Sequence, residues 1–181
     1  EGWSIPTFND WDILRNYLIF AEAAIKVRDP AYWGVGTNAT NEAKFNAKAG
    51  GWRNPNGTFT GLTTSNGYAI FDLDPVNGWT AYIENIWSAD ALWAIADITY
   101  INSGHSIRPV KDSTTLAHGQ TGRYTGNDGK VYRTICIGTQ EWLADNLYET
   151  KFRNGDLIPY YESAVDWAAL ATAGMCAYDN D

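Results

Sequence analysis

The side chains best suited to chemistry in this sequence are two cysteines and two histidines, and they form no catalytic pattern. Cys136 lies within an apolar, β-branched run, which favours an inert thiol over an activated thiolate. His118 has no carboxylate or cysteine nearby in sequence, and nothing beside His105 supports catalysis. The sequence contains no zinc-protease motif, nucleophile elbow, phosphate loop or metal-finger spacing. We therefore predict that the protein is not an enzyme.

Two acidic turns supply oxygens that could hold Ca²⁺, one at Asp72 and Asp74 and one at Asp179 and Asp181. Neither pair has the spacing of an EF-hand, and acidic residues in a solvated turn account for both. We therefore predict no cofactor, with Ca²⁺ as the one ion that these turns could bind.

The composition of the 181-residue chain fits one globular domain. A formal net charge of −8 argues against nucleic acids and anionic membrane surfaces as partners, because both select clustered Lys and Arg. No apolar run is long enough to span a bilayer, so we predict no membrane insertion. The two cysteines are too few for a disulfide scaffold; they could form one bridge, as in an exported protein, or stay as buried thiols.

A helix is predicted after Thr7, which suits an N-cap with Asp10 completing a capping box. Pro30 ends this helix. The apolar residues that recur at helical spacing, and so face the core, are Trp11, Leu14, Leu18, Ala21 and Ile25.

The rest of the chain predicts short elements joined by irregular segments. Residues 32–67 and 113–127 are polar and lack a sustained period, so we expect a long loop and a linker. Residues 131–137 predict a strand, and Ser163 suits the cap of a short helix. The chain as a whole predicts an α+β fold.

Residues 67–112 contain Trp79, Trp87, Trp93, Tyr82 and Tyr100. Short runs of Trp, Tyr, Ile and Thr alternate there with turn clusters, which is typical of a β-meander. Large apolar residues fall on both phases of strand alternation, so one set packs inward while the other can be covered by loops or offered to a partner. Each ring could instead simply fill the core. We interpret the stretch as a recognition platform rather than a catalytic cleft.

Three stretches carry motifs in a distinctive order and spacing. Residues 128–147 read DGKVYRTICIGTQEWLADNL, residues 2–14 read GWSIPTFNDWDIL, and residues 103–112 read SGHSIRPVKD. Together they resemble the Fibrobacter succinogenes major paralogous domain. That family is a branch of the C-type-lectin-like fold, related to formylglycine-generating sulfatase-modifying domains, and is typical of exported and surface proteins of Bacteroidota-like bacteria.

The resemblance implies a C-type-lectin-like fold with two helices around a small twisted antiparallel sheet and long loops. Residues 1–112 would be the C-terminal part of such a domain and residues 128–181 the N-terminal part, joined by a linker at 113–127. This reversed order implies a circular permutation or a cut through a tandem array. If the segment missing between the two parts is a core strand, a partner chain or a second copy would supply it by strand addition.

The cysteines depart from the family pattern. Pro109 stands in the closing strand where the family usually has a cysteine, and Cys136 lies on another strand instead. The resemblance therefore implies that Cys136 lies near Cys176 and that the two could be bridged.

The interior of the stretch 67–112 resembles the family least, although its flanks fit. This pattern is similar to the variable region of proteins that retroelements diversify on the same fold. The resemblance implies a bacterial or phage-encoded protein whose exposed side chains between residues 69 and 100 bind the ligand. The ligand-binding residues expected on this ground are Ile70, Phe71, Asp72, Asp74, Tyr82, Glu84, Trp87, Asp90, Trp93, Ile95, Asp97 and Tyr100.

We therefore expect an extracellular or cell-surface module that binds a protein or a glycan through its aromatic surface. The alternative is a structural subunit of a surface filament or adhesin, completed by a strand from a neighbouring chain. An enzyme akin to the sulfatase-modifying oxidases would need a reactive cysteine pair, and the surroundings of Cys136 do not favour one.

Overall fold

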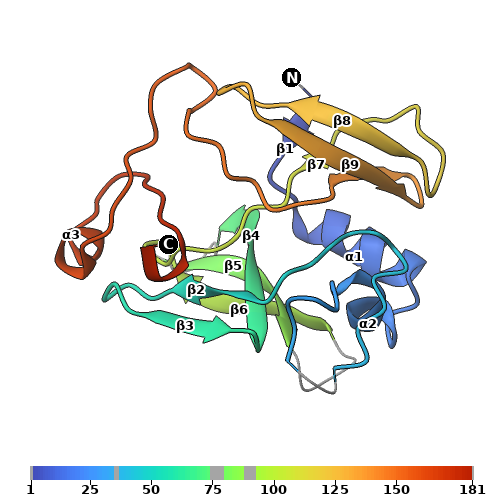
Figure 1. Ribbon diagram of the computed structural model, residues 1–181, viewed down its shortest axis with the longest axis horizontal. Coiled ribbons are helices and arrows are strands. Elements are labelled where there is room, and N and C mark those ends of the chain that lie inside the picture. Colours follow the sequence, from blue (N-terminus) through green and yellow to red (C-terminus); the bar gives the residue numbers. More distant parts are fainter. Residues whose placement is uncertain (1, 35–36, 74–79, 88–92, 181) are drawn as a thin grey trace.

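The computed structural model describes residues 2–34, 37–73, 80–87 and 93–180, apart from the side chains at 71, 73, 80–82, 94–99 and 180. Its regular structure is mixed α+β and consists mostly of strands (Figure 1). The α+β class predicted from the sequence is therefore confirmed.

Within the described residues, two five-stranded sheets form the framework, and they lie one above the other in Figure 1. The first is antiparallel, with the order β1 (Trp3–Ser4), β7 (Val110–Lys111), β10 (Gln140–Leu143), β9 (Val131–Ile137) and β8 (Thr121–Thr125). The second has the order β3 (Phe59–Leu62), β2 (Gly50–Arg53), β4 (Ser65–Leu73), β5 (Thr80–Trp87) and β6 (Trp93–Tyr100). Only the pairing of β2 with β4 is parallel among those described in the second sheet.

The first predicted helix is confirmed at its start but is shorter than expected. In α1 (Phe8–Tyr17), the Thr7 side chain accepts from the Asp10 amide while the Asp10 carboxylate accepts from the Thr7 amide, which completes the capping box. The helix stops because Ile19 has a left-handed φ of 68°. A second helix, α2 (Ala23–Val27), follows.

The break in the helix changes which residues face the core. Ala23, Ala24 and Val27 of α2 are buried, whereas Ala21, predicted to be buried, is exposed. The prediction of one continuous apolar face therefore holds only for α1, where Trp11 and Leu14 have no exposed surface.

The segments predicted as loop and linker contain strands. Residues 32–67 hold β2 and β3, joined by a turn in which Gly57 donates to the Asn54 carbonyl. Residues 113–127 hold β8, which pairs with β9 from Thr121 to Thr125. The predicted strand and the Ser163 cap are confirmed as β9 and as the start of α3 (Ala164–Ala168), and a last turn, η1, spans Tyr178–Asn180.

The core is an aromatic cluster centred on Trp11 of α1. Its ring centroid lies 4.8 Å from that of Trp142 in the first sheet, and 5.4 Å and 5.6 Å from those of Tyr68 and Trp93 in the second. Phe45, from the chain between α2 and β2, lies 6.1 Å away. The cluster therefore joins both sheets to the helix.

A buried ion pair ties the same helix to β5. Arg15 donates to Glu84, and neither side chain has exposed surface. Arg15 also donates to the exposed Asp12. Because an isolated buried charge is far costlier than a paired one, each side chain depends on the other.

No helix in the described part of the chain has the length and apolar character needed to cross a membrane.

Replacing Trp11 with Ala is expected to lower the free energy of unfolding by about 3–5 kcal/mol, because it leaves a cavity at the centre of the cluster. Ile13→Ala, on the exposed side of the same helix, is the matched control and should cost less than about 1 kcal/mol. Urea denaturation followed by circular dichroism measures both. Equal losses would show that Trp11 is not central to stability.

Candidate functional site

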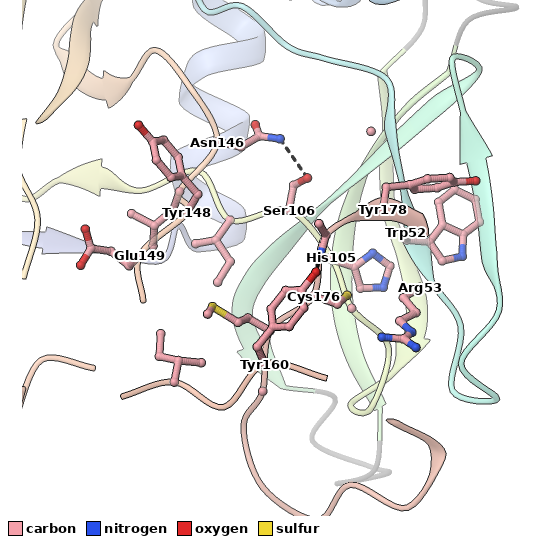
Figure 2. Close-up of a pocket in the computed structure, with 18 of the residues that line it drawn as sticks. Trp52, Arg53, His105, Ser106, Asn146, Tyr148, Glu149, Tyr160, Cys176 and Tyr178 are labelled. Atoms are coloured by element: carbon pink, nitrogen blue, oxygen red, sulfur yellow. Dashed lines mark hydrogen bonds between the residues drawn. The ribbon is translucent and has the colours of Figure 1, made fainter. Parts of the chain in front are cut away.

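A cavity of about 630 Å³ opens between β2 and the C-terminal part of the chain. Figure 2 shows Trp52 and Tyr178 on one side of it and Tyr148 on the other, with Tyr160 between them. Its volume lies within the range of roughly 300–1,000 Å³ that is typical of small-ligand sites. The aromatic residues that line it are Trp52, Phe59, Tyr148, Phe152, Tyr160, Trp167 and Tyr178.

Arg53 of β2 holds the C-terminal wall of the cavity in place. Its guanidinium donates to the carbonyls of Tyr161 at 2.6 Å, Glu162 at 2.7 Å and Gly57 at 3.1 Å. It also lies 4.6 Å from the ring centroid of Trp167 in α3. This buried cation therefore ties β2 to the irregular chain before α3 and to α3 itself.

Two glycines let the C-terminal wall approach the sheet closely. A Cβ on Gly51, which has a φ of +61°, would lie 2.2 Å from the Thr60 carbonyl and 2.8 Å from the Tyr178 ring. A Cβ on Gly104 would lie 2.8 Å from the Trp167 ring. The two rings can therefore lie against bare backbone only because these positions lack side chains.

The polar floor of the cavity is made by uncharged side chains. Asn146 donates to the Ser106 hydroxyl at 3.0 Å, as Figure 2 shows, and accepts from Arg108 at 2.5 Å. His105 stacks on Trp52, with ring centroids 6.4 Å apart. Burial lowers the pKa of His105 to about 4, so its imidazole is neutral near pH 7.

Three charged side chains line the cavity among the described residues, and each is engaged within the protein. Arg53 donates to three backbone carbonyls. Lys130 donates to Asp128 and to the Tyr148 carbonyl at 3.0 Å. Both oxygens of the buried Glu149 accept hydrogen bonds, from Tyr132 and from the Asp128 amide. The cavity therefore presents aromatic faces and neutral polar groups.

The sequence left open a bridge between Cys136 and Cys176 or two separate thiols, and in the structure both are free thiols. Cys136 is buried in β9 and donates to the Leu116 carbonyl at 3.2 Å, whereas Cys176 lines the cavity near Arg53. The pKa of each thiol is raised, chiefly by burial. Such thiols are poor nucleophiles and poor metal ligands at neutral pH.

Of the twelve predicted ligand-binding residues, three lie in the interior. Ile70 and Trp93 belong to the hydrophobic core, and Glu84 is the buried partner of Arg15. Their strand positions turn them towards the helices, so they offer no surface to a ligand in this structure. We leave these three out of the site.

Three others lie at least partly at the surface. Trp87 is 38% exposed and Tyr100 is 63% exposed. Asp72 is half-buried and accepts from the Phe8 amide at 2.8 Å, so it contacts the first turn of α1. The remaining predictions lie outside the described residues, either as whole residues or as side chains: Asp74, Asp90, Phe71, Tyr82, Ile95 and Asp97.

One predicted residue adjoins the cavity. The indole of Trp87, at the end of β5, meets that of Trp52 edge-on, with centroids 6.1 Å apart. Trp52 in turn lines the cavity and stacks on His105. A row of rings therefore runs from the predicted aromatic stretch into the cavity.

The cavity itself was not predicted from the sequence. Its walls come from residues 50–59, 104–107 and 130–178, which no local motif brings together. The signal that could have found it is the pairing of close-packing glycines with distant aromatic residues, as at Gly51 and Tyr178.

Within the described residues, no group of three or more His, Cys, Asp or Glu side chains is arranged to hold a metal ion. Of the acidic turns considered for Ca²⁺, Asp74 and Asp181 lie outside the described residues, and Asp72 contacts the α1 backbone.

Comparisons of the chain with protein-family models, with curated proteins and with solved structures find no match.

Replacing Arg53 with Met is expected to loosen the C-terminal wall, because the Tyr161 and Glu162 carbonyls lose their donors. Amide hydrogen exchange should speed up at least about tenfold across residues 150–178 and much less in α1. Arg123→Met on β8, where the side chain is exposed, is the matched control. Unchanged exchange in residues 150–178 would contradict this role for Arg53.

The stability of the protein is expected to fall as the pH drops from about 6.5 to about 4, because the unfolded chain protonates His105 more readily than the folded one. The whole difference in the pKa of His105 between the unfolded and the folded chain corresponds to about 3 kcal/mol in the free energy of unfolding. His105→Gln should flatten this part of the pH profile, measured by urea denaturation, whereas His118→Gln should not. Equal slopes for wild type and His105→Gln would contradict the burial effect.

Proposed function

We propose that the protein is a ligand-recognition module that binds its ligand in the aromatic cavity and on the adjoining Trp87. The observation that carries this proposal is the cavity itself, which combines seven aromatic side chains with neutral polar groups. Rigid aromatic side chains give a large contact area at small entropic cost, as they do in binding loops. A protein or a glycan is the class of ligand that we propose.

The chemistry of the cavity supports binding rather than catalysis. Burial raises the pKa of the Cys176 thiol and lowers that of His105 to about 4, so neither group is in the ionised form near pH 7. Nucleophilic or general-base catalysis needs a paired arrangement of such groups.

The proposal includes a C-type-lectin-like fold and a place at the cell surface or outside the cell, both taken from the sequence resemblance. Two features of the architecture support it. Helices α1 and α2 pack on twisted sheets with long irregular connections, and β7 from the first part of the chain pairs with β10 from the second. This pairing favours one unit, permuted in order, over two separate domains.

A structural role in a surface assembly is the second candidate, and the sheet edges favour it. Strand β8 ends the first sheet and β3 ends the second, so each could accept a strand from a partner chain. Light scattering at high protein concentration discriminates the two roles. A monodisperse monomer would argue against assembly.

The binding proposal is tested by screening the protein against printed arrays of glycans and of peptides. At least one ligand is expected to bind, and Trp52→Ala and Trp87→Ala should each weaken it by about tenfold or more, since aromatic anchors dominate such sites. Tyr32→Ala, exposed and away from the cavity, is the control with normal binding. Binding that survives both tryptophan changes, in variants with native circular dichroism, would overturn the proposal.

A further inference from the structure

We propose that the ligand of the cavity is a neutral saccharide, held between aromatic faces over a floor of uncharged hydrogen-bonding groups. This inference rests on the proposed binding function and names the class of its ligand.

The charged side chains of the lining are buried or paired within the protein, which disfavours a charged ligand. Arg53 and Lys130 are the described cations in the lining, and both donate to partners within the protein, while the carboxylate of Glu149 accepts from Tyr132 and the Asp128 amide. Arg53 is buried and Lys130 already pairs with Asp128, so a ligand carboxylate or phosphate would leave water without a direct ion pair to either. That cost is large in a half-enclosed site.

The floor of the cavity disfavours a purely apolar ligand. Asn146 uses one amide hydrogen on Ser106 and has a second to donate. The Tyr160 oxygen accepts from the Ala177 amide at 3.3 Å, and its hydroxyl hydrogen can donate. A hydrocarbon would cover these groups without pairing them, which costs free energy for each group.

The walls require a ligand with a flat apolar face. Trp52 and Tyr178 stand opposite Tyr148, and Tyr160 lies between the two sides, as Figure 2 shows. Their rings are half-buried or exposed, so each has surface available for contact. A pyranose ring presents C–H groups on its faces and hydroxyls around its rim, and each hydroxyl both donates and accepts. It therefore matches the walls and the floor at once.

The inference is tested by saturation-transfer NMR and calorimetry with soluble probes. The neutral probes are trisaccharides of glucose, mannose, galactose, xylose and N-acetylglucosamine, and the charged probe is a trisaccharide of galacturonic acid. We expect at least one neutral probe to bind, and the charged probe to bind at least about tenfold more weakly, a difference of about 1.4 kcal/mol.

Variants locate the bound saccharide. Tyr160 is 44% exposed, so Tyr160→Ala should weaken binding of the neutral probe by about tenfold without unfolding the protein. Tyr160→Phe should weaken that binding less, because the ring remains. Tyr32→Ala should bind as the wild type does. Tyr160→Ala provides a readout even if Trp52→Ala fails to fold.

The outcomes separate this inference from the proposed function. If no neutral probe binds, or if binding survives Tyr160→Ala, the saccharide inference is overturned. If a peptide from the array binds and its binding is lost in Trp52→Ala or Tyr160→Ala, the proposed binding function stands and the inference of a saccharide ligand is overturned. If neither class of ligand depends on these rings, both proposals fail.

Discussion

The packing of one ring, Trp11, sets the arrangement of both sheets. Its indole meets Trp142 of β10 on one side and Tyr68 and Trp93 of β4 and β6 on the other, so neither sheet can shift without opening a void beside it. The position of Trp11 depends in turn on where α1 begins. Asp72 of β4 accepts from the amide of Phe8 in the first turn, and this bond fixes the helix on the second sheet.

With the sheets fixed, buried arginines hold the irregular chain. Arg53 donates to carbonyls of the C-terminal wall, Arg108 to those of Phe45 and Asn46, and Arg28 to that of Thr37. Carbonyls in long loops lack the partners that a helix or sheet would give them. One guanidinium has five donors in a fixed geometry, so it can satisfy several of them at once. The fold can therefore keep long loops against its core.

The sequence predicted what local interactions decide. The cap at Thr7, the strand at 131–137 and the cap at Ser163 each depend on residues a few positions apart, and all are present. The continuous helix was wrong because the turn at Ile19 serves the packing of Ala23 and Ala24 rather than a local preference.

The site was harder to predict because it depends on distant residues. Strand alternation could not say which side of β4 to β6 faces the helices, so Trp93, which lies in the core, was expected at the surface. Trp52 and Tyr178 line one cavity although 126 positions separate them in the chain numbering. The guanidinium of Arg53 is buried, lies over Trp167 and donates to carbonyls of the C-terminal wall. Arg53 therefore shapes the cavity by holding backbone from a distant part of the chain against β2, a role that no local motif reveals.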